Sequence, residues 1–192
     1  MIDYHKSAEI FNHLMNGRVI NREVMGSHGA FENNHLFSEI MDHREDYSHQ
    51  YKMSGFHLVE NVDYFYIIKG QEFDIAKTQI AMKAYFLLTI LSKYATSNNI
   101  SISKLWSADG GISQAELVKI EELRDTKEIL ERCNLDDSLF KNIKVIMVDR
   151  DIAYIHPVSQ NIVLANAGRQ FFEDIKNDFE FHNQQEQDEL KT

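Results

Sequence analysis

The sequence holds one cysteine, Cys133, and one proline among its 192 residues. A lone cysteine cannot form an intrachain disulfide, which fits a reducing compartment. The scarcity of proline, together with only eight glycines, argues against a collagen-like or low-complexity chain. No apolar run is long enough to cross a bilayer, and the first residues lack the apolar core of a signal peptide. We therefore expect a cytoplasmic protein with no membrane partner.

Basic side chains are also in short supply, because 20 Lys and Arg oppose 30 Asp and Glu for a net charge of −10. Residues 1–70 carry 10 acids and 6 bases, residues 71–167 carry 13 and 11, and residues 168–192 carry 7 and 3. A negative surface repels phosphate. Duplex DNA is therefore not the default partner, although a local basic patch can override the net charge.

The apolar pattern of the first 70 residues predicts two helices and a hairpin. Residues 6–17 and 35–51 each place apolar side chains on one helical face. Between them, residues 18–21 suit a short strand, and residues 22–31 contain two glycines and suit a turn that can hold a short helix. Residues 56–68 alternate as two strands around a short turn. Helix, strand, short helix, helix and hairpin is the order of a winged helix.

The same order recurs further along the chain, starting with a long apolar helix over residues 73–99 that Asp74 can cap. Ser113 and Glu116 have the spacing of a capping box, which predicts the start of the next helix. A helix over residues 126–133 can continue it.

A third helix is predicted over residues 136–148, although Val145–Val148 would also suit a strand. Residues 152–165 then form a second hairpin, and residues 166–181 a closing helix. The predicted fold class is therefore mostly α with short β hairpins (α+β), as two tandem winged-helix domains. We place their bounds at residues 1–70 and 71–180, followed by a flexible tail over residues 181–192.

No group of side chains predicts catalysis, a cofactor or a bound metal. Two histidines follow acids at helical i,i+4 spacing, Glu39 with His43 and Glu45 with His49, but no HxxxH or CxxC spacing supports a metal site. Cys133 lies among acids that disfavour its thiolate. We therefore expect a non-enzymatic protein without cofactor or metal.

The predicted protein-binding surface combines one helix face with one strand face. Four apolar side chains share a face of the helix over residues 35–51, and two tyrosines share a face of the second hairpin strand. Tyrosine is enriched at protein interfaces, and the strand face could equally pack on the second domain. The predicted interface residues are Leu36, Ile40, Tyr47, Tyr51, Tyr64 and Tyr66.

The helix over residues 35–51 has the wrong charge for a DNA reader, because it carries four acids against a single arginine. The third helix of the second domain is less acidic. There we predict weak contact with the DNA backbone by Lys141, Lys144 and Arg150, with solvated surface side chains as the alternative.

Four segments in order along nearly the whole chain resemble the MukE- and MksE-type subunits of bacterial condensins. Residues 10–20 are similar to the opening helix, glycine and short strand. Residues 29–67 are similar to the helix with late tyrosines, the acidic turn and the aromatic strand. Residues 113–123 resemble the helix that opens the second domain's triangle, and residues 152–174 the final wing and closing helix. The tail is shorter than in MukE proper, which favours the MksE or defence branch.

The resemblance implies a non-enzymatic accessory subunit that forms a homodimer and binds a MukF/MksF-like kleisin. Through the kleisin it would join an SMC ATPase of the MukB/MksB type, in the cytoplasm and at the nucleoid. Such complexes act in chromosome condensation and segregation, whereas related Wadjet-type systems act against plasmids. A winged-helix transcription regulator is the remaining alternative. It would bind duplex DNA tightly, and the acidic first domain argues against it.

Overall fold

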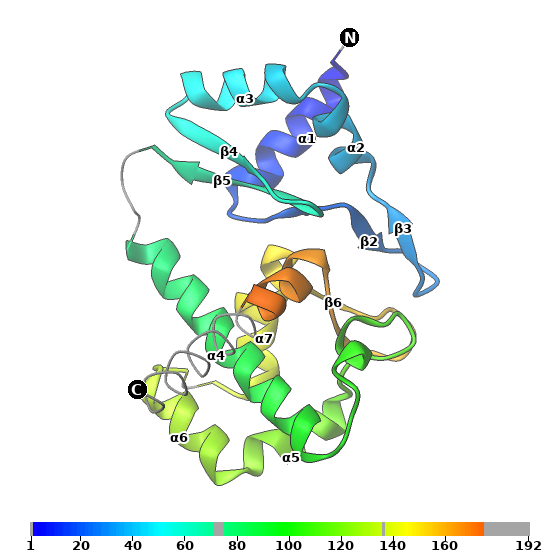
Figure 1. Cartoon of the computed structure of the whole chain (residues 1–192), viewed down its shortest axis with the longest axis vertical. Coiled ribbons are helices and arrows are strands. Elements are labelled where there is room, and N and C mark those ends of the chain that lie inside the picture. Colours follow the sequence, from blue (N-terminus) through cyan, green and yellow to red (C-terminus); the bar gives the residue numbers. More distant parts are fainter. Residues whose placement is uncertain (1, 71–74, 136, 175–192) are drawn as a thin grey trace, which may run out of the picture.

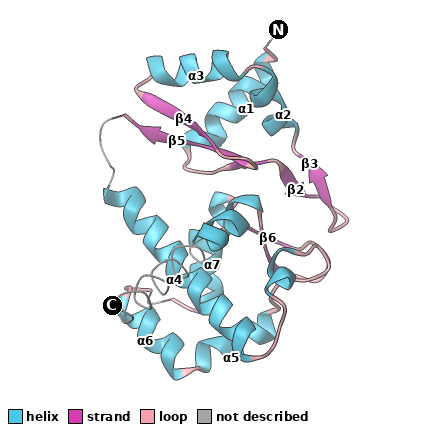
Figure 2. Ribbon diagram, viewed as in Figure 1, coloured by secondary structure: helices cyan, strands magenta, loops and turns pink. Residues whose placement is uncertain are grey.

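Helices alternate with short antiparallel sheets in the computed structural model, which describes residues 2–70, 75–135 and 137–174. The class is therefore α+β, as the sequence predicts. Figure 1 and Figure 2 show helices above a sheet in the N-terminal part and a mainly helical body below it. No helix within the described ranges is long and apolar enough to span a bilayer.

Three helices belong to the first unit, residues 2–70: α1 (Tyr4–Met15), α2 (His35–Asp42) and α3 (Arg44–Met53). The prediction of a single helix over residues 35–51 is wrong, because the backbone breaks at His43, where φ is −128° and ψ is 35°. The seven-residue spacing from Ile40 to Tyr47 suits one straight helix equally well, so the apolar pattern does not reveal the break.

A three-stranded antiparallel sheet lies against these helices in the order β1-β5-β4. Its strands are β1 (Ile20–Asn21), β4 (Phe56–Glu60) and β5 (Tyr64–Lys69). Strands β4 and β5 form the predicted hairpin, with Leu58 opposite Ile67.

A second hairpin occupies the segment where a turn with a possible short helix was predicted. It consists of β2 (Glu23–Met25) and β3 (Phe31–Asn33). Each strand has three residues and none of them is fully buried, so the segment lacks the alternation that marks a strand in a sequence. In Figure 1 the hairpin reaches from the first unit toward the second.

The second unit, residues 75–174 without residue 136, is mainly helical. Its elements are α4 (Ile75–Ser97), the 3-10 helix η1 (Ile102–Trp106), α5 (Gln114–Glu122), α6 (Arg124–Arg132), α7 (Leu139–Ile146), the 3-10 helix η2 (Val148–Arg150), β6 (Ala153–Ile155), β7 (Ile162–Leu164) and a helix from residue 166. The predicted capping box is confirmed, because the Ser113 hydroxyl accepts from the Glu116 amide at 3.2 Å and the Glu116 carboxylate accepts from the Ser113 amide at 2.8 Å. The strand alternative for Val145–Val148 is wrong, since this segment is helical.

The two units have separate apolar cores. One cluster of buried side chains runs from Ile10 to Ile67 and the other from Ala84 to Leu164, with no buried member in common. The division into domains at residues 70 and 71 stays a prediction. The proposed cap Asp74 and the predicted tail over residues 181–192 lie outside the described residues.

Two replacements of Tyr51 separate the contribution of its ring to the free energy of unfolding from that of its hydroxyl. The side chain is 1% exposed, and its phenol oxygen has no hydrogen-bond partner among the described residues. Tyr51→Phe should therefore change the free energy of unfolding by less than about 1 kcal/mol. Tyr51→Ala should lower it by about 3–5 kcal/mol, because it leaves a cavity. Urea denaturation of both variants measures the difference, and equal losses would contradict this account.

Candidate interaction site between the two units

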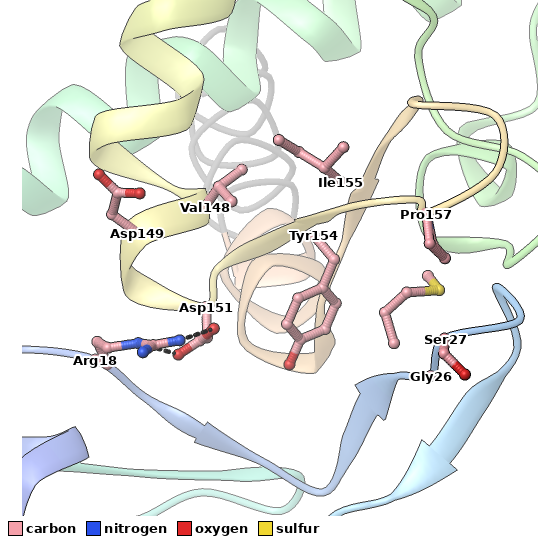
Figure 3. A pocket seen from close by; sticks show the side chains of 10 residues that line it. Arg18, Gly26, Ser27, Val148, Asp149, Asp151, Tyr154, Ile155 and Pro157 are labelled. Carbon is pink, nitrogen blue, oxygen red and sulfur yellow. Dashed lines mark hydrogen bonds and ion pairs between the residues drawn. The ribbon is translucent and has the colours of Figure 1, made fainter.

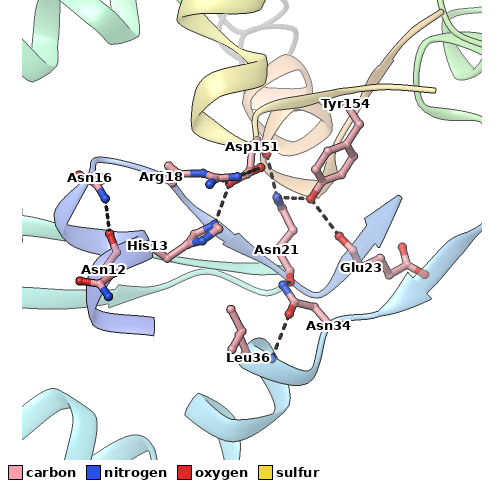
Figure 4. A network of polar contacts seen from close by, with 10 residues as sticks. All are labelled: Asn12, His13, Asn16, Arg18, Asn21, Glu23, Asn34, Leu36, Asp151 and Tyr154. Atoms are coloured by element: carbon pink, nitrogen blue, oxygen red, sulfur yellow. Dashed lines mark hydrogen bonds and ion pairs between the residues drawn. The ribbon is translucent and has the colours of Figure 1, made fainter. Parts of the chain in front are cut away.

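A carboxylate of the second unit is held by Arg18 and His13 of the first (Figure 4). Asp151 follows η2 and has a left-handed backbone, with φ of 58°. Arg18 donates from Nε and Nη2 to the two carboxylate oxygens of Asp151 at 2.7 and 2.8 Å. Nε2 of His13 lies 2.7 Å from Oδ2 of the same carboxylate. The side chain of Asp151 is 11% exposed, so this bidentate pair is largely shielded from water.

We call the polar contacts between the two units the junction; Asp151, Arg18 and His13 form one part of it. Asn21, which is 1% exposed, forms the second part. Its Nδ2 donates to the backbone oxygen of Asp151 at 2.7 Å and lies 3.0 Å from the hydroxyl of Tyr154. Its Oδ1 accepts from the amide of Ala167 at 2.9 Å. The Asn21 side chain is thus bonded on both its donor and acceptor sides, all to the second unit, which fixes its orientation.

The charge state of the junction follows from its geometry. Burial by itself would raise the pKa of the Asp151 carboxyl, but the hydrogen bonds and charges of His13 and Arg18 outweigh burial and hold this pKa below its usual value. Burial, reinforced by the Asp151 charge, raises the pKa of the Tyr154 phenol. At neutral pH the junction therefore contains a carboxylate, a guanidinium and a neutral phenol.

The β2–β3 hairpin adds a further contact between the units. Gly29 at its tip has a φ of 85°, and a Cβ there would lie 2.2 Å from Nε2 of His156 in the β6–β7 loop. Only glycine allows this close approach. A cavity of about 550 Å³ between the hairpin and the second unit is lined by Arg18, Ser27 and Tyr154 among others, and Figure 3 shows their side chains.

A second and more apolar cavity, here called the groove, opens between the units with a volume of about 620 Å³. Tyr64, Tyr66 and Ile68 of β5 line it on the first unit. The rings of the two tyrosines stack with centroids 5.9 Å apart, and Nδ2 of Asn61 lies 3.0 Å from the Tyr64 hydroxyl. From the second unit, the groove is lined by Ile80, Ala81, Ala84, Arg150, Ile152, Ala167 and Phe171.

The six predicted interface residues divide into two groups. Tyr64 and Tyr66 are half-buried and line the groove. The other four are 0–4% exposed in the core of the first unit, so they present no surface to a partner. The apolar face of an amphipathic helix is first used to bury the helix on its own sheet. The four core residues are Leu36, Ile40, Tyr47 and Tyr51.

The break at His43 also changes the charge of the presumed DNA-reading helix. The helix α3 carries two acids and two bases, so it has no acid excess. The other two acids belong to α2, where Glu39 is buried and accepts a hydrogen bond from the Asp3 amide at 3.0 Å. The argument from an acidic recognition helix is therefore corrected to a neutral one.

The predicted DNA-contacting residues differ in their exposure and in their partners. Lys141 and Lys144 are exposed on α7, and Lys141 pairs with Asp137 at 2.8 Å. Arg150 is half-buried, donates to the backbone oxygen of Val145 and lines the groove. No cluster of three metal-ligating side chains occurs among the residues that the structure describes.

Residues distant in sequence form the junction, and sequence analysis missed all of them. Asn21 and Asp151 are separated by 130 positions, and neither belongs to a recognisable motif. Nothing in the short segments "RVIN" and "DRD" of the sequence indicates that they lie in contact.

The variant Asp151→Asn tests the value of the ion pair, because asparagine keeps the shape and tolerates the left-handed backbone. We expect the free energy of unfolding at pH 7 to fall by about 2 kcal/mol, since Arg18 loses its shielded counter-ion. The folded-state pKa of Asp151 lies below its unfolded value, so its charge stabilises fully above about pH 5 and this contribution fades as the pH falls below about 4. Urea denaturation at several pH values measures this. Asp149→Asn, at an exposed neighbouring residue, is the control. A difference in the free energy of unfolding between Asp151→Asn and the unmodified protein that widens toward low pH would contradict the assignment.

No curated protein and no solved structure matches the chain. A family model described as condensin complex protein MksE matches residues 5–176. Because this match covers nearly the whole sequence, the chain belongs to the MksE family of condensin complex proteins.

Proposed function

We propose that this condensin subunit has no catalytic activity of its own and binds a MukF/MksF-like kleisin in the groove. The observation that carries the proposal is the groove itself, which is apolar, open and built from both units. Its stacked tyrosines offer rigid aromatic area at a low entropic cost, as at many protein interfaces. The kleisin would connect the subunit to a MukB/MksB-like SMC ATPase in the cytoplasm, at the nucleoid.

We also propose that each unit is a winged helix and that the protein is a homodimer. In the first unit, α1, β1, α2, α3 and the β4–β5 hairpin follow the winged-helix order, with the β2–β3 hairpin inserted. In the second unit, an isolated bridge joins Ile112 to Ile162 of β7. This bridge places Ile112 beside the second hairpin strand, as β1 lies beside β5 in the first unit.

Chromosome condensation and segregation is the role that we propose for the whole complex. Within it, Lys141 and Lys144 are the residues of this subunit proposed to make weak contact with the DNA backbone. Each is exposed, and the ion pair with Asp137 limits the attraction that Lys141 can offer to phosphate. Plasmid defence by a Wadjet-type complex is the alternative role, and the genes beside this one and plasmid-loss assays distinguish the two.

Ile68→Glu tests the groove as the kleisin site. Ile68 is 40% exposed, so the charge is tolerated in the free protein but would be desolvated under an apolar partner. Titration with the purified kleisin should show a dissociation constant raised about tenfold or more. The matched control is Val118→Glu, an exposed valine on α5 outside the groove, which should bind as the unmodified protein does. Equal affinities of the two folded variants would refute this placement.

A further inference from the structure

Strand β4 forms an open edge of the first unit's sheet. The amide of Gly70 donates to the oxygen of Gly55, and the amide of Asn61 donates to the oxygen of Tyr64, both at 2.9 Å. Hydrogen-bonded and non-hydrogen-bonded pairs alternate in an antiparallel ladder, so the backbone groups of His57 and Val59 face β5. Those of Phe56, Leu58 and Glu60 point the other way. We call these outward groups the β4 edge.

The β4 edge lacks the usual protection against pairing with another strand. Its five residues, Phe56–Glu60, pair with β5 without a bulge and include neither proline nor lysine. No described residue bonds to the outward backbone groups. Glu60, the one charged side chain of the strand, is paired with Arg44 at 2.6 Å. A regular strand edge of this kind accepts a further strand.

The exposed apolar side chains at the two ends of β4 can pair with those of a second copy. Met53 precedes the strand and is 72% exposed, and Val62 follows it and is 71% exposed. If two copies of β4 run antiparallel with Leu58 opposite Leu58, Phe56 faces Glu60 of the second copy. Every outward amide then meets an outward carbonyl. The same two-fold arrangement brings Met53 of each copy toward Val62 of the other, so two exposed apolar side chains cover each other at both ends.

We propose that two copies of this chain associate through their β4 edges, so that the β1-β5-β4 sheet continues across a two-fold axis. The proposal rests on the proposed function only in that a homodimer forms, and it names the surface. An extended peptide would satisfy the same backbone groups. The second copy is preferred because its own Met53 and Val62 supply the apolar side chains that cover both ends of the strand, so the surface carries its own complement.

Glu60→Pro removes an outward amide and leaves the ladder to β5 intact, which is where proline is tolerated in a sheet. Glu60→Ala removes the same side chain and keeps the amide, so it is the matched control for loss of the Arg44 pair. By sedimentation equilibrium, Glu60→Pro should raise the dimer dissociation constant about tenfold or more, because each dimer loses two hydrogen bonds. Glu60→Ala should remain close to the unmodified protein. Circular dichroism checks that both variants fold.

Hydrogen exchange of the unmodified protein gives an independent measure. The Leu58 amide should be protected at concentrations where the dimer forms and should exchange freely on dilution. The Val59 amide, which faces β5, should stay protected in both cases. As a side-chain test, Val62→Glu should weaken the dimer, whereas Val158→Glu, at an exposed valine of the second unit, should not.

The outcomes separate this surface from the proposed function. A dimer that persists in Glu60→Pro, with a freely exchanging Leu58 amide, would overturn the β4 edge while the homodimer stands on another surface. An unmodified protein that remains monomeric at about 100 μM, a concentration at which even a weak dimer forms, would overturn both the edge and the homodimer, leaving the kleisin groove untouched. Protection of Leu58 only after kleisin is added would assign the edge to the kleisin.

Discussion

A shielded ion pair between Asp151 and Arg18 is the centre of the polar contacts that place the two units relative to each other. A carboxylate that is 11% exposed carries a large desolvation cost, and the bidentate guanidinium and His13 offset it. Such a pair is more demanding in geometry than an apolar contact, because a small displacement leaves a charge without a partner. Asn21 adds the same directional demand to the backbone of Asp151 and Ala167. The junction therefore favours one orientation of the units, whose two apolar cores share no buried side chain.

The groove is a consequence of that orientation. Its walls come from β5 and residues 14–19 on one unit, and from α4, Arg150, Ile152 and the C-terminal helix on the other. If the junction turned, Tyr66 and Phe171 would no longer line the same space. Each unit alone offers only part of the apolar area. The affinity of a partner for the groove would thus depend on the junction, although the partner would not contact most of the junction residues. In this way a structural ion pair affects a binding surface.

Local elements of this chain could be predicted from its sequence, and contacts between them could not. The capping box at Ser113 and the β4–β5 hairpin follow from spacing within a few residues, and both are confirmed. The break at His43 escaped because the apolar stripe continues across it. The β2–β3 hairpin escaped because strands of three residues, none of them buried, carry no periodicity. The junction escaped altogether, since nothing in the neighbourhood of Asn21 indicates a partner 130 positions away.

The same reasoning explains why apolar helix faces are poor guides to binding surfaces. In a unit of about 70 residues the buried fraction is small, so nearly every apolar stripe is needed for the core. Tyr47 and Tyr51 illustrate this, because both are buried although tyrosine is common at interfaces. The apolar side chains left at the surface are the more informative ones: Tyr66 and Ile68 in the groove, Met53 and Val62 at the ends of β4. Exposed apolar side chains also lie on α1, at Tyr4, Phe11 and Met15. The apolar surface that the core of the first unit does not need is therefore divided between α1 and the surroundings of the β4–β5 hairpin.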